Sequence, residues 1–385
     1  MDLNLTGGNG INGEMLSIAA NTLSCAIENV GGFADSPAKG VGTIDQSGGE
    51  NLVNDPIATL GVGGLTLGYN VGDDGFYNLS GGTLLSEELA AEPILAYYPP
   101  PFPAIETVGL SGVGVFNQTG GTNLLMPARS GDAAILCLGS NAGSTGTYIL
   151  SGSASLTVTG TEFVGFGGVG VFNQTGGTNT LIQPGSVNDD RDAGVLSICV
   201  NYGGTGTYNL SGGSLTAAGV VIDAEVGLGY GDEFDGVGVL DVSGGSLNTG
   251  TLEVGRPQLL GSSQAIMTLT GGVVTASDLT VNGQLNDQAG SLTAASATID
   301  LGSMTVDGAA NCATITLGYI GTLTVNGVLT SGNTVVVGIL PGFSPQGGTL
   351  DGAGNGSTTG FVANVLLISG VIQPGNSVSA IGTLT

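Results

Sequence analysis

The stretch GVGVFNQTGGTN occurs twice without a change, from Gly112 to Asn123 and again from Gly168 to Asn179. Weaker copies surround the two identical ones, and they begin at Gly40 (GVGTIDQSGGEN), Gly75 (GFYNLSGGTL), Gly146 (GTYILSGSAS), Gly204 (GTGTYNLSGGSL) and Gly236 (GVGVLDVSGGSL). Such self-similarity indicates a repeat architecture, in which each unit buries its apolar face against its neighbours.

Each unit contains two positions that are two residues apart and therefore lie on one face of a strand. The first position is mostly aromatic and holds Ile44, Tyr77, Phe116, Tyr148, Phe172, Tyr208, Leu240 and Met267. The second holds Gln46, Leu79, Gln118, Leu150, Gln174, Leu210, Val242 and Leu269. We predict that both positions form an inward-facing core ladder. The residue between them is usually Asn and should face outward, as an external Asn ladder rather than as glycan acceptors.

The second position alternates between Gln and Leu, which predicts that the structural repeat is a pair of coils. An inward Gln needs hydrogen-bond partners, because an unpaired buried amide costs about 1–3 kcal/mol. A Gly-Gly doublet follows the ladder positions and suits a tight turn, since glycine adopts positive φ without a Cβ penalty. Two further short strands follow in each unit. The prediction is an all-β fold, a single continuous β-solenoid with about three short strands per coil, its hand left open.

Composition supports this class. The chain has 385 residues, 74 of them glycine without a three-residue period, and 41% are hydrophobic, which excludes collagen and a disordered chain. We expect residues 1–260 to form an irregular solenoid decorated by loops, with an insertion at 86–110. Residues 261–345 should form a leaner, regular solenoid, and residues 346–385 a strand-rich tail.

The charge balance limits the partners. Thirty acidic residues face four basic ones, and a formal net charge of −26 disfavours nucleic acid and anionic membrane surfaces. No apolar run reaches the ~18 residues that span a bilayer. The first residues show no secretory signal pattern, so we expect either a processed piece or export without such a signal.

The FNQTGGT and TYNLSGG units resemble bacterial autotransporter-associated β-strand repeat proteins, and the ending PGNSVSAIGTLT is similar to an element that those passenger regions often carry. The resemblance covers most of the chain and implies a secreted or cell-surface β-helix of bacterial type. Its motifs report architecture and imply no catalytic residues.

The segment Ser86–Leu110 interrupts the repeat spacing, and it mixes Tyr97, Tyr98 and Phe102 with five prolines. Proline denies a strand its ladder hydrogen bonds, so this segment should leave the solenoid as a loop. Three interpretations are open: a loop folded over its own coil, a contact patch between proteins, or a platform that stacks on surface glycans.

Acidic residues cluster in loops before several repeats, and these candidate Ca²⁺ ligands are Asp73, Asp74, Asp189, Asp190, Asp192, Asp232, Glu233 and Asp235. Hard oxygen ligands close together suit Ca²⁺, although the spacing matches no standard calcium loop. The alternative is solvated loop charge. No other cofactor is expected.

Catalysis has little support in the sequence. Without histidine, Ser-His and Cys-His nucleophile pairs are excluded, and acid–base work would fall to carboxylates. The cluster Asp189–Asp192, which includes Arg191, is the local candidate for a polysaccharide lyase or hydrolase. We expect no enzyme.

Four cysteines are present, without a CxxC pair: Cys25, Cys137, Cys199 and Cys312. Cys137 and Cys199 occupy comparable positions in the repeat pattern. We interpret them as small buried hydrophobic residues. The alternative is a disulfide between stacked neighbours, which requires Cα atoms within ~7 Å.

Both chain ends look able to pair as strands, with Leu3 and Leu5 at one end and Leu384 at the other. Exposed strand edges promote association, and head-to-tail contact that does not close produces a filament. The sequence therefore favours an extracellular structural protein whose copies join axially into a filament, fibre or sheath. The alternative is a surface adhesin or glycan-binding passenger.

Overall fold

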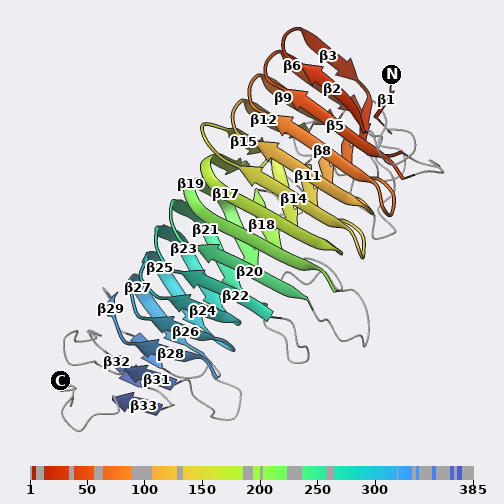
Figure 1. Ribbon diagram of the computed structural model, residues 1–385. Coiled ribbons are helices and arrows are strands. Elements are labelled where there is room, and N and C mark those ends of the chain that lie inside the picture. The colour runs from red at the N-terminus through yellow and green to blue at the C-terminus, as the bar shows by residue number, and fades with distance from the viewer. Residues whose placement is uncertain are drawn as a thin grey trace.

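The computed structural model of the protein describes residues 2–5, 13–33, 39–55, 64–88, 106–127, 133–184, 194–199, 203–222, 236–256, 264–318, 320–331, 335–337, 349–352, 365–367 and 371–374. Every regular element in these residues is a strand, and none is a helix. The strands wind into an elongated stack of coils with the N- and C-termini at opposite ends (Figure 1). The predicted all-β solenoid is confirmed.

Each coil contributes strands to three faces of the stack. The first face carries the repeat motif and consists of β2 (Glu14–Ile18), β5 (Val41–Gln46), β8 (Asp74–Leu79), β11 (Val113–Gln118), β14 (Thr145–Leu150), the start of β17 (Val169–Leu181), the start of β19 (Thr205–Ile222), β20 (Val237–Val242), β22 (Gln264–Leu269), β24 (Gln284–Asp287), β26 (Ser303–Val306), β28 (Thr322–Val325), β31 (Thr349–Gly352) and β33 (Val371–Pro374).

The second face follows the Gly-Gly turn. It consists of β3 (Thr22–Cys25), β6 (Glu50–Asp55), β9 (Thr83–Glu88), β12 (Thr122–Pro127), β15 (Ser155–Val158), the end of β17, the middle of β19, the start of β21 (Ser246–Val254), β23 (Val273–Val281), β25 (Ser291–Ile299), β27 (Ala309–Leu317) and β29 (Val328–Ser331).

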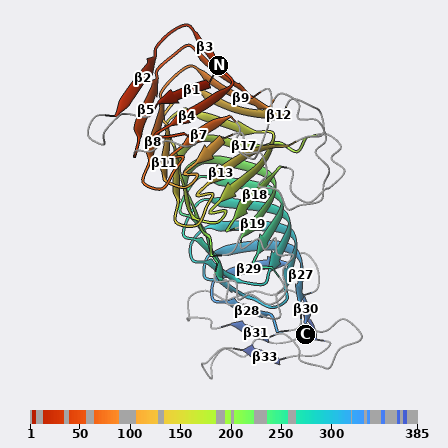
Figure 2. The same cartoon turned by 90° about the vertical axis from the view of Figure 1, so that its right-hand side faces the viewer.

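The third face closes the coil. It consists of β1 (Asp2–Leu5), β4 (Ile27–Val30), β7 (Leu65–Leu67), β10 (Glu106–Val108), β13 (Ala134–Leu138), β16 (Gly160–Val164), β18 (Val195–Ile198), the ends of β19, β21, β23, β25 and β27, β30 (Val335–Val337) and β32 (Val365–Leu367). All pairings are parallel, and Figure 2 shows successive strands stacked along the axis.

The core ladder lies where the sequence predicts it. Both ladder positions are in register from coil to coil, for example Phe116 with Tyr148 and Gln118 with Leu150. Their side chains are at most 1% exposed from Ile44 to Leu269. The strand period of two thus fixes which side chains enter the core.

The solenoid becomes leaner beyond β22. Gln284 pairs with Ser303 and Ser303 with Thr322, so one coil takes 19 residues there. Earlier coils are longer, and Val113 lies 39 residues beyond its partner Asp74. The core changes with the coil length, because the aromatic ladder position continues as Met267, Leu285, Met304 and Leu323.

Third-face strands commonly end at a glycine with positive φ. At Gly165 the φ angle is 79°, and an added Cβ would lie 2.2 Å from the carbonyl oxygen of Thr205 in the next coil. The close approach of two backbones therefore requires glycine there.

Replacing Gly165 with alanine should lower the free energy of unfolding by more than the about 1–2 kcal/mol that a left-handed backbone costs an L-residue, because the new methyl group also meets backbone. The matched control is Gly143→Ala, since Gly143 has a φ of 82° but no neighbour within 4 Å of its Cβ position. Equal losses in denaturant unfolding of the two variants would contradict this explanation.

The four cysteines are buried, and none forms a disulfide. Cys137 pairs with Phe163, which pairs with Ser197, so Cys137 and Cys199 do not occupy comparable positions, and that prediction is wrong. Cys199 instead takes the place of the strand-ending glycine: its amide donates to Val164 O as that of Gly165 donates to Leu138 O, and its φ is 64°.

Candidate functional site

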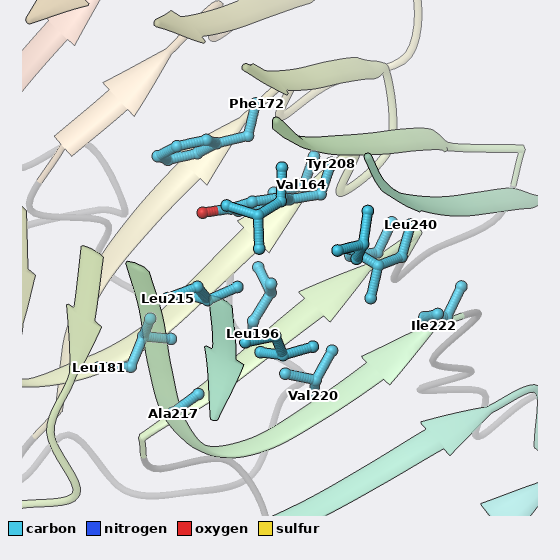
Figure 3. Packing of buried hydrophobic residues seen from close by; sticks show 14 of the residues in the cluster. Val164, Phe172, Leu181, Leu196, Tyr208, Leu215, Ala217, Val220, Ile222 and Leu240 are labelled. Carbon is cyan, nitrogen blue, oxygen red and sulfur yellow. The ribbon is translucent and has the colours of Figure 1, made fainter. Parts of the chain in front are cut away.

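The most distinctive chemistry of the described residues lies inside the first seven coils. Five aromatic rings from consecutive coils stack along the axis, Tyr77, Phe116, Tyr148, Phe172 and Tyr208. Neighbouring ring centroids are 4.5–4.9 Å apart, and the ring planes differ by no more than 7°. Figure 3 shows the rings of Phe172 and Tyr208 lying flat above one another. Each pair contributes about 0.5–1.5 kcal/mol beyond its buried area.

Each tyrosine hydroxyl is bonded to a glutamine of the preceding coil. Tyr148 donates to Gln118 Oε1 at 2.6 Å, and the amide of Gln118 donates in turn to the carbonyl of Ser155 at 3.0 Å. Tyr77 with Gln46 and Tyr208 with Gln174 repeat this arrangement. The inward glutamines therefore have the partners that the sequence analysis required.

An asparagine and a glutamate complete each group. Asn123 of the second face donates from Nδ2 to the hydroxyl of Tyr148 at 3.2 Å and to Glu106 Oε2 of the third face at 2.9 Å. We call Gln46, Asn51, Tyr77 and Glu28 the first cluster, Gln118, Asn123, Tyr148 and Glu106 the second cluster, and Gln174, Asn179, Tyr208 and Glu162 the third cluster. Each cluster links all three faces.

The clusters recur every second coil. Coils with Gln in the ladder also carry the Asn, and coils with Tyr carry Leu at both of those positions. On the third face Glu28, Leu65, Glu106, Leu136, Glu162 and Leu196 follow one another in register. The prediction that the structural repeat is a pair of coils is consistent with this alternation.

The three carboxyl groups are fully buried. Burial raises the pKa of Glu28 and of Glu106 to about 7 and the pKa of Glu162 to about 8, while the bond from each asparagine acts in the opposite direction. Burial also raises the pKa of the three tyrosines well above its ordinary value, and the neighbouring glutamates add to this effect.

The residue between the two ladder positions faces outward, as expected. Asn78 donates to Asp45 Oδ1 at 2.8 Å, and Asn209 donates to Asn173 Oδ1 at 2.8 Å. These side chains are partly exposed and form segments of an external amide ladder.

Two of the candidate calcium ligands lie in described residues. Asp73 is buried, and its carboxylate accepts hydrogen bonds from the backbone amides of Gly40 and Asn70 and from the Asn70 side chain. Asp74 begins β8. The other candidates, Asp189, Asp190, Asp192, Asp232, Glu233 and Asp235, lie outside the described residues, as does Arg191. Within the described part no group of three acidic or cysteine side chains could hold a metal ion, and the calcium site stays a prediction.

The proposed interaction loop is described only at its two ends. Residues 86–88 belong to β9, and Glu106–Val108 form β10, so these ends continue the second and third faces. Tyr97, Tyr98 and Phe102 lie outside the described residues. Leu3 and Leu5 lie in β1 and pack against the core, whereas Leu384 lies outside the description.

Sequence reasoning missed the asparagines and glutamates of the clusters. The asparagines carry a signal, because each follows its glutamine by five residues, as Gln118 and Asn123 show. The glutamates carry none, because they follow connections of variable length.

The arrangement binds and orients protons between fixed groups, and it offers no open space for a substrate. Comparisons of the chain with protein-family models, with curated proteins and with solved structures gave no match. The described residues also contain no helix that is long and apolar enough to cross a membrane.

Proposed function

We propose that this protein is an extracellular structural protein whose copies stack end to end into a filament, fibre or sheath. The observation that carries the proposal is the open first coil. Within the described residues β1, β2 and β3 each pair on one side only, with β4, β5 and β6. Three backbone edges are therefore available for pairing at this end.

The side chains of the first coil support the same conclusion. Leu3, Leu5, Leu16 and Leu23 face the core but stay partly exposed. The residues paired with them in the next coil, Glu28, Val30, Ile44 and Asn51, are 0% exposed. A further coil stacked on this end would bury the four leucines as the interior coils bury theirs.

The opposite end has matching edges. In the described part of the chain β29, β32 and β33 also pair on one side only. Because all ladders are parallel, β3, β1 and β2 of a second copy could continue the second, third and first faces. Such a contact joins different surfaces and does not close, so it extends into a filament.

The sides of the rod are less suited to self-association. On the second face an outward row of Thr and Asn crosses eight successive coils and consists of Thr157, Thr180, Thr216, Asn248, Thr275, Thr293, Asn311 and Thr330. This row is polar and uncharged, whereas the first coil is apolar at its end. The proposed partner is therefore another copy, contacted axially. The extracellular location rests on the resemblance of the repeats to autotransporter-associated β-strand repeat proteins.

Electron microscopy of the native protein tests the proposal, and we expect filaments one solenoid wide. Leu16→Asp places a charge on the exposed end of the core and should leave single rods. Met15→Asp is the matched control, because Met15 is 68% exposed on the outside of the same strand and its change should preserve the filaments.

Circular dichroism should show that both variants keep their strand content. Isolated rods of the unchanged protein at high concentration would overturn the proposal and would favour the adhesin alternative. Loss of filaments in both variants alike would show that the end of the core is not the contact.

A further inference from the structure

Each cluster contains buried oxygen atoms that lack a donor. Glu28 Oε1, Glu162 Oε1 and the Oδ1 atoms of Asn51, Asn123 and Asn179 have no hydrogen-bond partner. Glu106 Oε1 differs, because it accepts a hydrogen bond from Ser86 Oγ at 2.7 Å. Buried acceptors without donors are rare in folded proteins, and a pattern that recurs every second coil needs a physical reason.

The missing donor is supplied most simply by the carboxyl group itself. An ionised carboxylate only accepts hydrogen bonds, and so does an amide oxygen. The asparagine Nδ2 already donates to Glu Oε2 in all three clusters, at 2.9, 2.9 and 3.0 Å. A proton on Oε1 would provide a donor for the asparagine Oδ1 and would close a ring of two hydrogen bonds between a carboxylic acid and a primary amide.

We propose that Glu28, Glu106 and Glu162 are carboxylic acids in the folded protein at neutral pH, each in a doubly hydrogen-bonded pair with Asn51, Asn123 or Asn179. The solenoid thus holds three protons in its core and releases them when the pH rises. This inference concerns the interior of one chain and does not depend on filament formation.

The surroundings of the three groups are consistent with neutral acids. The titratable groups that act on Glu28 and its cluster are Glu106, Tyr77 and Cys25. Glu106 and Glu162 lie on either side of Tyr148, and Glu162 also acts on Tyr208. The two basic side chains in the described residues are not among these groups: Lys39 is exposed, and Arg256 acts on Glu253. Burial raises the pKa of all three carboxyls to between about 7 and about 8.

Carbon NMR of the full chain, labelled at the glutamate carboxyl carbons, tests the proposal directly. Three signals should titrate with midpoints above about pH 6, and each should disappear in one of the variants Glu28→Gln, Glu106→Gln and Glu162→Gln. Glutamine retains both hydrogen bonds, because its amide nitrogen donates to the asparagine Oδ1 and its oxygen accepts from Nδ2, so the variants should keep the fold.

Titration of every glutamate signal below about pH 5 would overturn the proposal. A second measurement covers the case in which a variant folds poorly: the infrared carbonyl band of un-ionised carboxylic acids should be present in the unchanged protein at about pH 6. Absence of that band would also overturn it. The matched control Glu14→Gln/Glu50→Gln/Glu87→Gln removes three surface glutamates and should leave both the band and the three signals in place.

Discussion

Raising the pH from about 4.5 to about 8 should strongly lower the free energy of unfolding. Folding raises the pKa of Glu28, Glu106 and Glu162 from 4.5 to about 7, 7 and 8. Between these limits the folded state binds more protons than the unfolded state, so stability falls with increasing pH. Their contribution is complete below about pH 4.5 and is lost as the pH rises through the folded values. At ~1.4 kcal/mol per pKa unit the combined effect is on the order of 10 kcal/mol.

Denaturant unfolding at a series of pH values measures this dependence. The net charge of −26 also weakens the fold as acidic surface groups ionise, so a control is needed. Glu28→Gln/Glu106→Gln/Glu162→Gln should show a much flatter curve between about pH 5 and 8. The surface variant Glu14→Gln/Glu50→Gln/Glu87→Gln removes the same formal charge and should keep the steep one. Equal slopes in the two triple variants would show that the buried carboxyls do not cause the dependence.

Removing the hydroxyl of Tyr148 should cost about 2–5 kcal/mol, although the ring and its stacking remain. In Tyr148→Phe the Oε1 atom of Gln118 loses its donor at 2.6 Å, and one N–H of Asn123 loses its acceptor at 3.2 Å. Each buried group left without a partner costs about 1–3 kcal/mol. Denaturant unfolding at a pH of about 5, where the carboxyls are protonated, separates this loss from the pH effect.

The neighbouring ring provides the control. Phe172 is also 0% exposed in the same stack, but its coil follows Leu150 and not a glutamine, so Phe172→Tyr introduces a hydroxyl without that acceptor. Both exchanges should destabilise the protein. Adding Gln118→Leu to Tyr148→Phe should cost less than the sum of the two single changes, because the two groups share one hydrogen bond. Additive losses would argue against the coupling of the cluster.

The first face could be predicted from the sequence, and the third could not. Residues such as Phe116 and Gln118 sit at a fixed distance before a Gly-Gly turn, and the two-residue period of a strand then determines their direction. The third face follows connections of variable length. Gln46 and Gln118 are 72 residues apart, whereas Glu28 and Glu106 are 78 apart, so no constant spacing relates the glutamates.

The cluster itself required the structure for a further reason. Buried glutamates are uncommon, and pattern reasoning assigns an acidic residue such as Glu162 to the surface. Only the parallel register brings Glu162, Asn179 and Tyr208 from three faces to one point. The inward glutamines gave the sequence-level indication that polar partners had to exist, without identifying them.

The alternation of coils also gives the rod a quantum of length. The two identical stretches at 112–123 and 168–179 begin in β11 and β17, with the coil of β14 between them. Insertion or deletion of one coil would reverse the parity of everything beyond it and would set a phenol against a leucine or an amide against a phenylalanine. Two coils added together reproduce a complete set of partners. In the part of the chain that holds the clusters, the protein can therefore lengthen or shorten without penalty only by an even number of turns.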